Sequence, residues 1–465
     1  MNTDELYQQW KSFCNGKSKK ETNNMKIHWP KIAIPEGFEN AESYLSHLVY
    51  EGAKKRYADK DGAYMREINE KIDYELDFLT GFEPYFIFYY HLIEYCHSEN
   101  ILVSPGYGSA ANSMVNYCLG ITQIEPNSWL VFENFFLRGT DNFPDIDIVV
   151  EDARRDDLIQ YLKTTYGEDC VLKAGVGYRP NFEKKRSERV PVYSVHASGI
   201  CIFDKPYNEV TDTIEIESED TNQKTIVPRM TMQELKSMGY ICINILGMEK
   251  LTCISRCLKL IEQNKGLSIN YDRIPDEDPA TLEFLSSGHE DIGKIWCSNT
   301  LTEIFGEIKF TYMEDLYSIN AIWCPALYEN TYQFIYLMKA DESAEIFEIF
   351  YEYFYELTRG LLLYREQIPV ILSLLSDWDF TECERMRRYM RYPDYMPIKR
   401  NFLEGVKRLG LHDIEEAVRI WKYFMENHKK VVSLSHITCT TTMWYRASWF
   451  RVHYPEEFKE CYPLK

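Results

Sequence analysis

Two aspartates separated by one residue are the part of this sequence best suited to chemistry. Asp145 and Asp147 lie in the segment FPDIDIVV, residues 143–150, whose alternation and β-branched residues predict a strand. Residues i and i+2 of a strand point to the same face, so the two carboxylates should lie together. Such close like charges raise each other's pKa unless a cation separates them, and Mg²⁺ is the usual cation. An edge strand with two solvated acids is the alternative.

A glycine-rich turn earlier in the chain could bind a phosphate. Residues 104–109 (SPGYGS) follow the apolar run 101–103 and precede a segment, 110–119, that we expect to be a helix. Gly108 and Ser109 would stand at its N-terminus, where free backbone N–H groups and the helix dipole favour an anion. A plain turn is the alternative reading of these residues alone. A phosphate-binding turn, a helix and an Asp-x-Asp strand, in this order, are typical of a nucleotidyltransferase palm.

The elements around these motifs predict an α+β fold. Apolar residues recur at helical spacing at 41–57 and 64–80, and the segment 84–97 is nearly all apolar or aromatic, which suits a buried helix. A further helix is expected to open at Asp152, with acidic residues in its first turn, and to end at Gly167. Strands are expected at 192–203 and 241–246, and the chain is mostly helical from residue 251. We therefore expect an α+β body up to about residue 250 and a helical region after it.

Composition excludes several classes of protein. The 465 residues include 45% hydrophobic residues, and 52 basic against 72 acidic residues give a net charge of −20, so a wholly basic nucleic-acid-binding coat is excluded. The sequence contains no run of about 18 apolar residues, which is the length that a membrane-spanning helix needs. From the polar, acidic residues at the start of the sequence we expect no signal peptide, and the 13 cysteines form no CxxC pair. Cys253 and Cys257 are expected to fill a helix face in the core. A reduced, cytoplasmic protein is the simplest expectation.

The motifs resemble the polymerase core of the bacterial replicative DNA polymerase III alpha subunit, the C family. That family's Gly-Arg-Gly-Ser turn and Gly-Ile-Thr-x-x-x-Pro segment correspond to residues 106–126, GYGSAANSMVNYCLGITQIEP. Its Pro-Asp-x-Asp-x-Asp strand and Arg-Arg-Asp helix correspond to FPDIDIVVEDARRDD, residues 143–157. Further matches follow in the family's order: HASGICIF (196–203), INILGMEKLT (243–252), TRGLLLYREQ (358–367), ECERMRRYM (382–390), SLSH (433–436) and WFRVHYPEEF (449–458).

The resemblance implies a polymerase-beta-like nucleotidyltransferase palm followed by a mainly helical fingers domain. The implied divisions are an N-terminal extension (1–36), the first part of the palm (37–172), a short segment in place of a thumb (173–195), the second part of the palm (196–250) and the fingers (251–465). A basic run, Lys184, Lys185, Arg186 and Arg189, stands where the thumb should be. It could contact a nucleic-acid backbone or form a solvated loop.

The implied activity is DNA-directed DNA polymerisation by two Mg²⁺ ions that three aspartates hold. Asp145 and Asp147 match the first two aspartates and would be the metal ligands, whereas Asn244 stands at the third position. Asparagine removes one negative charge, so Mg²⁺ binding and catalysis should both be weakened. The implied nucleotide-binding residues are Gly108, Ser109, Arg387, Arg388 and His436.

Other departures weaken the implied activity further. The family's turn arginine is Tyr107, and the lysine of its Asn-Lys-Ser-His motif is Leu434, so phosphate-facing cations have been lost. DNA and a deoxynucleoside triphosphate are the implied ligands, and a protein partner is expected. The alternative is a catalytically inactive homologue that serves as a nucleic-acid-, nucleotide- or protein-binding scaffold. For Arg387 and Arg388 a solvated helix face is the alternative. His196 is expected to make a structural hydrogen bond rather than to act as a ligand.

Overall fold

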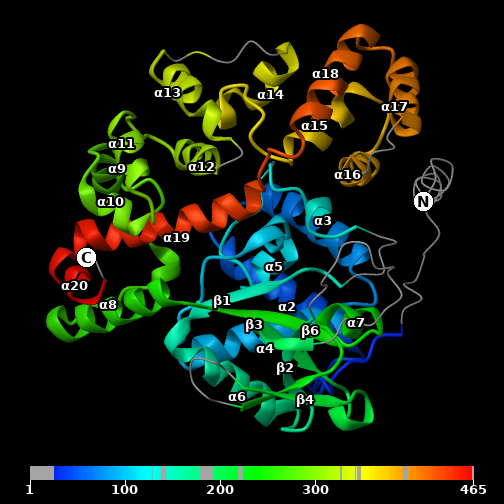
Figure 1. The fold of residues 1–465 in the computed structure, drawn as a ribbon, viewed down its shortest axis with the longest axis vertical. Coiled ribbons are helices and arrows are strands. Elements are labelled where there is room, and N and C mark those ends of the chain that lie inside the picture. The colour runs from blue at the N-terminus through cyan, green and yellow to red at the C-terminus, as the bar shows by residue number, and fades with distance from the viewer. Residues whose placement is uncertain are drawn as a thin grey trace.

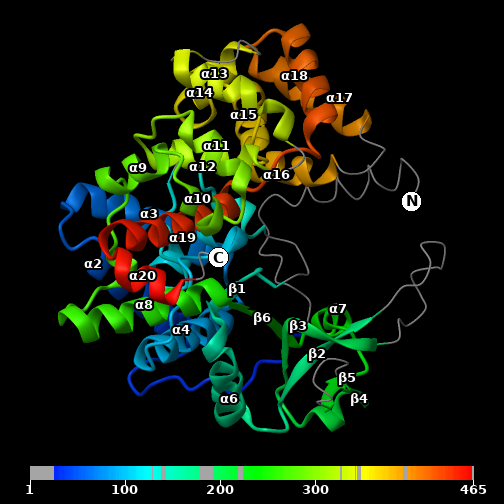
Figure 2. The same ribbon diagram turned by 60° about the vertical axis from the view of Figure 1, so that its left-hand side comes forward.

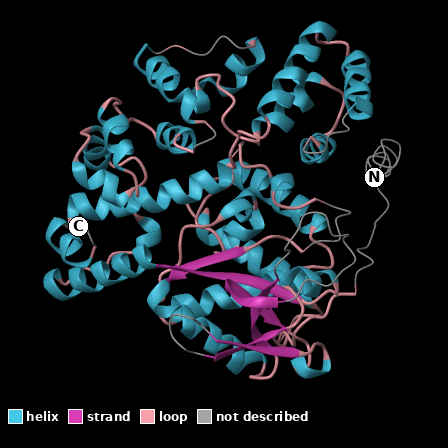
Figure 3. Ribbon diagram, viewed as in Figure 1, coloured by secondary structure: helices cyan, strands magenta, loops and turns pink. Residues whose placement is uncertain are grey.

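The fold divides into a sheet part, residues 26–248, and a helical part, residues 249–462 (Figure 1). It is given by a computed structural model that describes residues 26–127, 129–137, 143–177, 192–217, 224–324, 327–340, 342, 347–390 and 396–462. Strands occur in the lower half of the molecule in Figure 3, and the upper half is built of helices. The expected basic run at 184–189 lies outside the described residues.

Three helices open the sheet part close to their predicted positions. They are α2 (Ala41–Arg56), α3 (Gly62–Phe78) and α4 (Glu83–Ser98). The side chain of Asn40 accepts a hydrogen bond from the Ser43 amide and so caps α2, as short polar residues do at helix N-termini. Helix α4, which is apolar nearly all round, is buried against the sheet in a core that also holds Ile148 and Ile243.

The expected helix over 110–119 is wrong in its extent. The glycine turn, residues 104–109, leads into a 3₁₀-helix, η1 (Gly108–Asn112), and then into a single-turn helix, α5 (Met114–Cys118). Ser113 separates the two because its backbone is extended and its hydroxyl accepts from the Asn116 amide, which starts a new helix. Gly108 and Ser109 therefore open a 3₁₀-helix rather than a long α-helix.

The main sheet has four strands in the order β1-β6-β3-β2. They are β1 (Asp147–Glu151), β2 (Val171–Gly177), β3 (Val192–Ile202) and β6 (Ile241–Met248). Strands β1 and β6 are parallel, whereas the pairs β3–β6 and β2–β3 are antiparallel. The strand predicted over residues 143–150 begins only at Asp147 in the structure, because residues 143–146 precede β1. Helix α6 (Arg155–Tyr166) follows β1 through the 3₁₀-helix η3 (Asp152–Arg154) and ends at Gly167.

Three strands were not predicted. Strand β2 crosses the expected boundary at 172/173, so the start of the segment assigned in place of a thumb pairs within the main sheet. Strands β4 (Thr213–Glu217) and β5 (Lys224–Pro228) form a separate two-stranded sheet, and the short helix α7 (Met232–Ser237) leads into β6. Part of the expected N-terminal extension contacts this region, because the His28 amide donates to the Gly239 carbonyl.

The helical part begins with α8 (Glu249–Lys265) and is organised around the long helix α19 (Leu434–His453) (Figures 1 and 2). Helix α19 packs against α9, α12 and α20 of the helical part and against η1 of the sheet part. The remaining helices are α9 (Pro279–Ser286), α10 (Glu290–Ile295), α11 (Asn299–Gly306), α12 (Met313–Ile322), α13 (Thr331–Ala340), α14 (Glu348–Thr358), α15 (Gln367–Leu375), α16 (Phe380–Tyr389), α17 (Met396–Leu409), α18 (Ile414–Asn427) and α20 (Pro455–Cys461).

Two expectations from composition can be compared with the described residues. None of the helices described is long and apolar enough to cross a membrane. The cysteines in these ranges are free thiols, and Cys253 and Cys257 are buried on α8 in the core of the helical part.

Candidate active site

Asp147 and Asn244 lie side by side on neighbouring strands. Asp147 is the first residue of β1, and the parallel register pairs it with Asn244 of β6. The alternation of β1 explains this placement, because Ile148 and Val150 point into the core and leave Asp147 on the opposite face. The predicted convergence of these two residues is therefore found in the structure.

A chain of hydrogen bonds joins the polar side chains on this face. The Asn244 Nδ2 atom donates to Asp147 Oδ1 at 2.8 Å, and the Ser198 hydroxyl donates to Asn244 Oδ1 at 3.3 Å. An ionised carboxylate only accepts hydrogen bonds, so the amide must turn its Nδ2 toward Asp147. Next to them, His196 Nδ1 accepts from the Ser198 and Gly199 amides, which agrees with a structural hydrogen-bonding role for this histidine.

Asp145 lies just before the strand and is exposed, whereas Asp147 is half-buried. Burial raises the pKa of Asp147, the hydrogen bond from Asn244 lowers it, the negative charge of Asp145 raises it again, and the nearby Lys236 lowers it. The balance leaves the Asp147 pKa above its usual value. An amide hydrogen bond thus opposes, but does not cancel, the cost of holding this carboxylate ionised.

These residues do not fit a metal pair. Asp145 and Asp147 supply two carboxylates, and Asn244 presents an N–H donor where a metal would need an oxygen. In the parts of the chain that the structure describes, no group of three or more histidine, cysteine, aspartate or glutamate side chains is placed to hold a metal.

The glycine turn reaches the same face because its start runs along the free edge of β1. Val103 forms an antiparallel bridge with Val150, and the Ser104 amide donates to the Val149 carbonyl at 2.8 Å. The chain then continues toward Asp147, whose charge adds to burial in raising the pKa of Tyr107. Gly108 has a φ of 60°, in the left-handed region that favours glycine.

His436, on α19 of the helical part, packs against the glycine turn. Its ring meets the Tyr107 ring edge to face, with centroids 5.0 Å apart. Burial lowers the pKa of His436, and the positive charge of Arg365 lowers it further, so the imidazole is neutral at pH 7. A β-carbon at Gly106 would come within 3.0 Å of Cys439 Sγ on α19, so glycine lets the turn and helix pack this closely.

Arg387 and Arg388 are both held by one buried glutamate. Glu384 accepts from Arg387 Nη2 at 2.6 Å and from Arg388 Nε at 2.8 Å. Arg388 also donates to the backbone carbonyls of Glu133 and Asn134 in the sheet part. Burial opposes ionisation of Glu384, but the two arginines hold its pKa below the usual value. Arg388 therefore joins α16 to the sheet part at the junction between the two parts of the fold, and Glu384 holds both arginines there.

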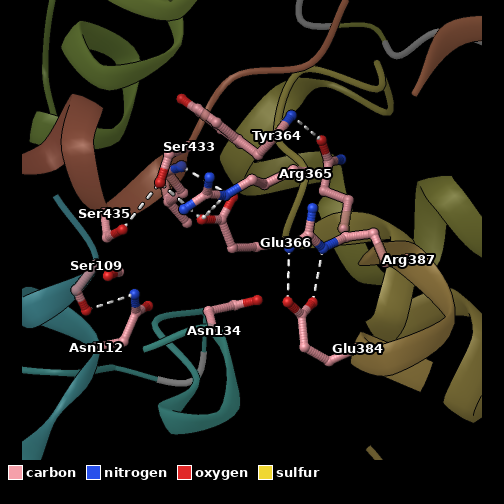
Figure 4. Close-up of polar contacts among 12 residues, drawn as sticks. Ser109, Asn112, Asn134, Tyr364, Arg365, Glu366, Glu384, Arg387, Ser433 and Ser435 are labelled. Atoms are coloured by element: carbon pink, nitrogen blue, oxygen red, sulfur yellow. Dashed lines mark hydrogen bonds and ion pairs between the residues drawn. The ribbon is translucent and has the colours of Figure 1, made fainter. Parts of the chain in front are cut away.

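Figure 4 shows how the two parts face each other at this junction. Ser109, Asn112 and Asn134 come from the sheet part, across from Glu366 and the Glu384–Arg387 pair. Asn134 is buried, and neither polar atom of its side chain has a hydrogen-bond partner among the described residues. Glu366 accepts from the Leu434 amide and the Ser433 hydroxyl, and so fixes the start of α19.

Sequence reasoning missed Glu384, Glu366 and Asn134. A signal for Glu384 existed, because it stands three and four residues before the two arginines, and such spacings bring side chains together on a helix. The pairing of Glu366 with the start of α19 joins residues 68 positions apart and has no local signal. The structure thus brings Asp145, Asp147, Asn244 and the glycine turn together, with His436 beside the turn and Arg387 and Arg388 at the junction.

Comparisons with known proteins show which family the chain resembles. Residues 43–179 match the bacterial DNA polymerase III alpha NTPase domain, and residues 250–410 match the bacterial DNA polymerase III alpha subunit finger domain. The chain is 26% identical to the DNA polymerase III subunit alpha of Staphylococcus aureus, with 92% of this chain and 45% of the relative aligned. It is 25% identical to the Thermus aquaticus subunit, with 93% and 41% aligned. The chain thus spans less than half the length of these relatives.

The fold and site define an α+β protein consistent with polymerase-like domains. Within that class, the chain is a divergent homologue of the bacterial DNA polymerase III alpha subunit, which confirms the resemblance seen in the sequence.

Proposed function

We propose that this protein is a DNA polymerase III alpha-like core that binds nucleic acid and nucleotide between a palm and a fingers domain, and that its nucleotidyl transfer is impaired. The observation that carries the proposal is the hydrogen bond from Asn244 Nδ2 to Asp147 Oδ1. It occupies a carboxylate oxygen that a two-metal site would need for a cation. The proposed palm comprises residues 37–172 and 196–250, and the proposed fingers residues 251–465.

The chemical argument concerns charge. In a two-metal transferase, the cations align the attacking and leaving oxygens and neutralise the charge that develops on them. A neutral amide at residue 244 contributes neither a negative charge to attract a cation nor a base to accept a proton. Asp145 and Asp147 alone would bind Mg²⁺ less tightly than three carboxylates, because affinity grows with the number of charged ligands.

Nucleotide binding is proposed for Gly108, Ser109, Arg387, Arg388 and His436. Ser109 and Arg387 belong to the two parts of the chain that face each other in Figure 4, and we propose that a polyphosphate binds between these parts. Its charge would compete with Glu384 for the two arginines, since that carboxylate already holds both. We therefore expect nucleotide affinity to be low.

Primer extension tests this proposal. The wild-type protein should extend a primed template slowly or not at all with Mg²⁺ or Mn²⁺, and Asn244→Asp should increase the rate. Asp147→Asn serves as the control that removes a remaining ligand. Rapid extension by the wild type that Asp147→Asn abolishes would overturn the proposed impairment.

The second candidate is a scaffold that binds no nucleotide. The internal pairing of Arg387 and Arg388 with Glu384 favours it, because both guanidinium groups already bind this carboxylate and one of their two positive charges is balanced within the chain. Titration with a fluorescent deoxynucleoside triphosphate separates the two candidates. Binding that Arg387→Ala weakens supports the nucleotide site, whereas no binding at millimolar nucleotide supports the scaffold.

A further inference from the structure

Lys250, in the first turn of α8, has its ammonium group held by the helical part. The Nζ atom donates to the backbone carbonyls of Lys294 at 3.0 Å and Ile295 at 2.8 Å. The rings of Trp444 and Tyr462 lie beside it, with their centroids 4.6 and 5.6 Å from Nζ. Two carbonyls and two aromatic faces therefore fix the position of this cation without a carboxylate among them.

The sulfur of Cys297 is also in contact with Lys250. Cys297 lies between α10 and α11, and its Sγ atom is 2.6 Å from Lys250 Nζ. Reacting atoms stand about 3–3.5 Å apart in a near-attack arrangement, so these two atoms are already close enough to react. Among the cysteines that the structure describes, only Cys297 is exposed. A small oxidant can therefore reach this sulfur from solvent.

The surroundings of Cys297 are those of a reactive cysteine. Reactive cysteines are partly exposed and lie beside cations, because the thiolate is the nucleophile. The two carbonyls beside Lys250 Nζ stay neutral, so the Cys297 sulfur is the atom of this group that can become an anion. Cys297 also has a φ of 58°, a left-handed conformation that residues other than glycine adopt at a cost. The fold thus holds the thiol against the amine in spite of this cost.

The Tyr462 hydroxyl lies near the same sulfur and lacks a hydrogen-bond partner. The Tyr462 side chain is 2% exposed, and its hydroxyl oxygen bonds to none of the residues that the structure describes. Burial raises the pKa of Tyr462, and negative charge on the nearby Cys297 raises it further. A buried hydroxyl without an acceptor is costly, and an oxygen atom bound to the Cys297 sulfur would provide one.

We propose that Cys297 and Lys250 are a modification site, at which hydrogen peroxide produces a reversible covalent S–N cross-link. The Cys297 thiolate attacks one oxygen of the peroxide, the O–O bond breaks, and a sulfenic acid and hydroxide form. The Lys250 amine, after releasing a proton to solvent, attacks the sulfur, so that the S–N bond forms and the S–O bond breaks. In sum, one thiol, one amine and one peroxide give one sulfenamide and two water molecules. A thiol reductant that attacks the sulfur releases the amine again.

The cross-link would restrain the start of α8. Lys250 follows the last residue of β6, Met248, by two positions, and α8 packs against β1, which begins at Asp147. Once joined to Cys297, the first turn of α8 could no longer separate from the segment between α10 and α11. This modification is separate from the proposed polymerase-like function, because neither residue belongs to the candidate active site.

Peptide mapping of the full-length protein tests the cross-link. The protein is treated with hydrogen peroxide, its remaining thiols are alkylated in denaturant, and its tryptic peptides are analysed by mass spectrometry. A peptide pair that joins Lys250 to Cys297 should appear, with a mass two hydrogen atoms below the sum of its parts, and dithiothreitol should abolish it. Absence of this pair, or a disulfide from Cys297 to another cysteine in its place, would overturn the proposal.

Substitutions separate this reaction from a structural contact. Lys250→Arg keeps a cation beside the sulfur, but a guanidinium group does not lose its proton, so the cross-link should disappear. The sulfenic acid should then accumulate, and labelling of Cys297 by the sulfenic-acid reagent dimedone should increase severalfold. Cys297→Ser should abolish both the cross-link and the labelling at this position.

The matched control is Lys294→Gln, which removes a neighbouring amine but keeps the backbone carbonyl that Lys250 contacts. It should change the yield of cross-link less than twofold. A cross-link that persists in Lys250→Arg, or that Lys294→Gln reduces equally, would overturn the proposal. Circular dichroism melts confirm that each variant folds, and Lys250→Arg and Cys297→Ser alter different residues in case one variant fails to fold.

Discussion

Asn244, which the family resemblance places at the position of a third aspartate, is uncharged and donates a hydrogen bond to Asp147, and substitution with aspartate tests this difference. In Asn244→Asp the donor to Asp147 is lost and a third negative charge is added beside Asp145, so without metal the protein should be destabilised by about 1–3 kcal/mol. Mg²⁺ should restore this loss, because a ligand that binds only the folded state stabilises it by about 2.7 kcal/mol at a hundredfold excess over Kd. Thermal melts in chelator and in Mg²⁺ provide the measurement, with the wild type as control. A variant that melts identically in both conditions would contradict a latent metal site.

Glu384 is a buried carboxylate that holds Arg388 where it contacts the sheet part. Glu384→Gln leaves Arg387 and Arg388 without their buried counter-charge, and breaking a buried pair in this way costs about 3–5 kcal/mol. Urea unfolding measures the loss. The matched control is Asp377→Asn, which breaks the exposed pair with Arg408 and should cost less than about 1 kcal/mol. Similar losses in both variants would show that Glu384 contributes no more than a surface pair.

At the scale of elements, Glu75 ties α3 to the short helix α5. Its carboxylate accepts from the Ser113 hydroxyl and from the Met114 and Val115 amides, yet burial raises its pKa from 4.5 to about 7. The folded state therefore holds a proton that the unfolded chain releases between these values, so stability should fall as pH rises from about 5 to 8. At 1.36 kcal/mol per pKa unit, the loss is about 3 kcal/mol at most.

Glu75→Gln isolates this contribution because glutamine does not titrate. Urea unfolding at pH 5 and pH 8 gives the free energy of unfolding for both proteins, and the wild type should lose more stability between the two pH values than the variant. The difference between them removes the contributions of all other titrating groups. Parallel pH profiles would show that Glu75 does not gain a proton in the folded state.

The helices α2 to α4 and the strands β1, β3 and β6 could be predicted because their apolar spacing is local and regular. Strand β2 could not, since VLKAGVG has no clear alternation and becomes a strand by pairing with β3. The neighbouring positions of Asp147 and Asn244 followed from the family resemblance. The amide hydrogen bond between them did not, because it depends on how the side chains orient.

At the scale of the whole molecule, the uneven charge of the helical part indicates where nucleic acid would bind. A net charge of −20 repels phosphate at long range, so affinity must come from a local basic surface and should be weak. The exposed cations Arg400 and Lys407 on α17 lie within the basic region, residues 380–430, which contains twelve basic and eight acidic residues. Lys309 is also exposed but lies within residues 299–358, which contain eleven acidic and two basic residues. If nucleic acid binds to the basic region, substitution of Arg400 and Lys407 should weaken binding, whereas substitution of Lys309 should not.

The salt dependence of binding tests this difference. Each phosphate contact contributes about −0.9 to the slope of log K against log salt for duplex DNA, so four contacts would weaken binding about 100-fold between 50 and 200 mM salt. Filter binding of Arg400→Ala/Lys407→Ala should give weaker affinity and a slope shallower by about 2, because two counterion releases are lost. Lys309→Ala should leave the slope unchanged, since its acidic surroundings keep phosphate away. Tight binding that is insensitive to salt would contradict an electrostatic interface, and equal slope changes in both variants would show that the charge asymmetry does not direct nucleic acid to one region.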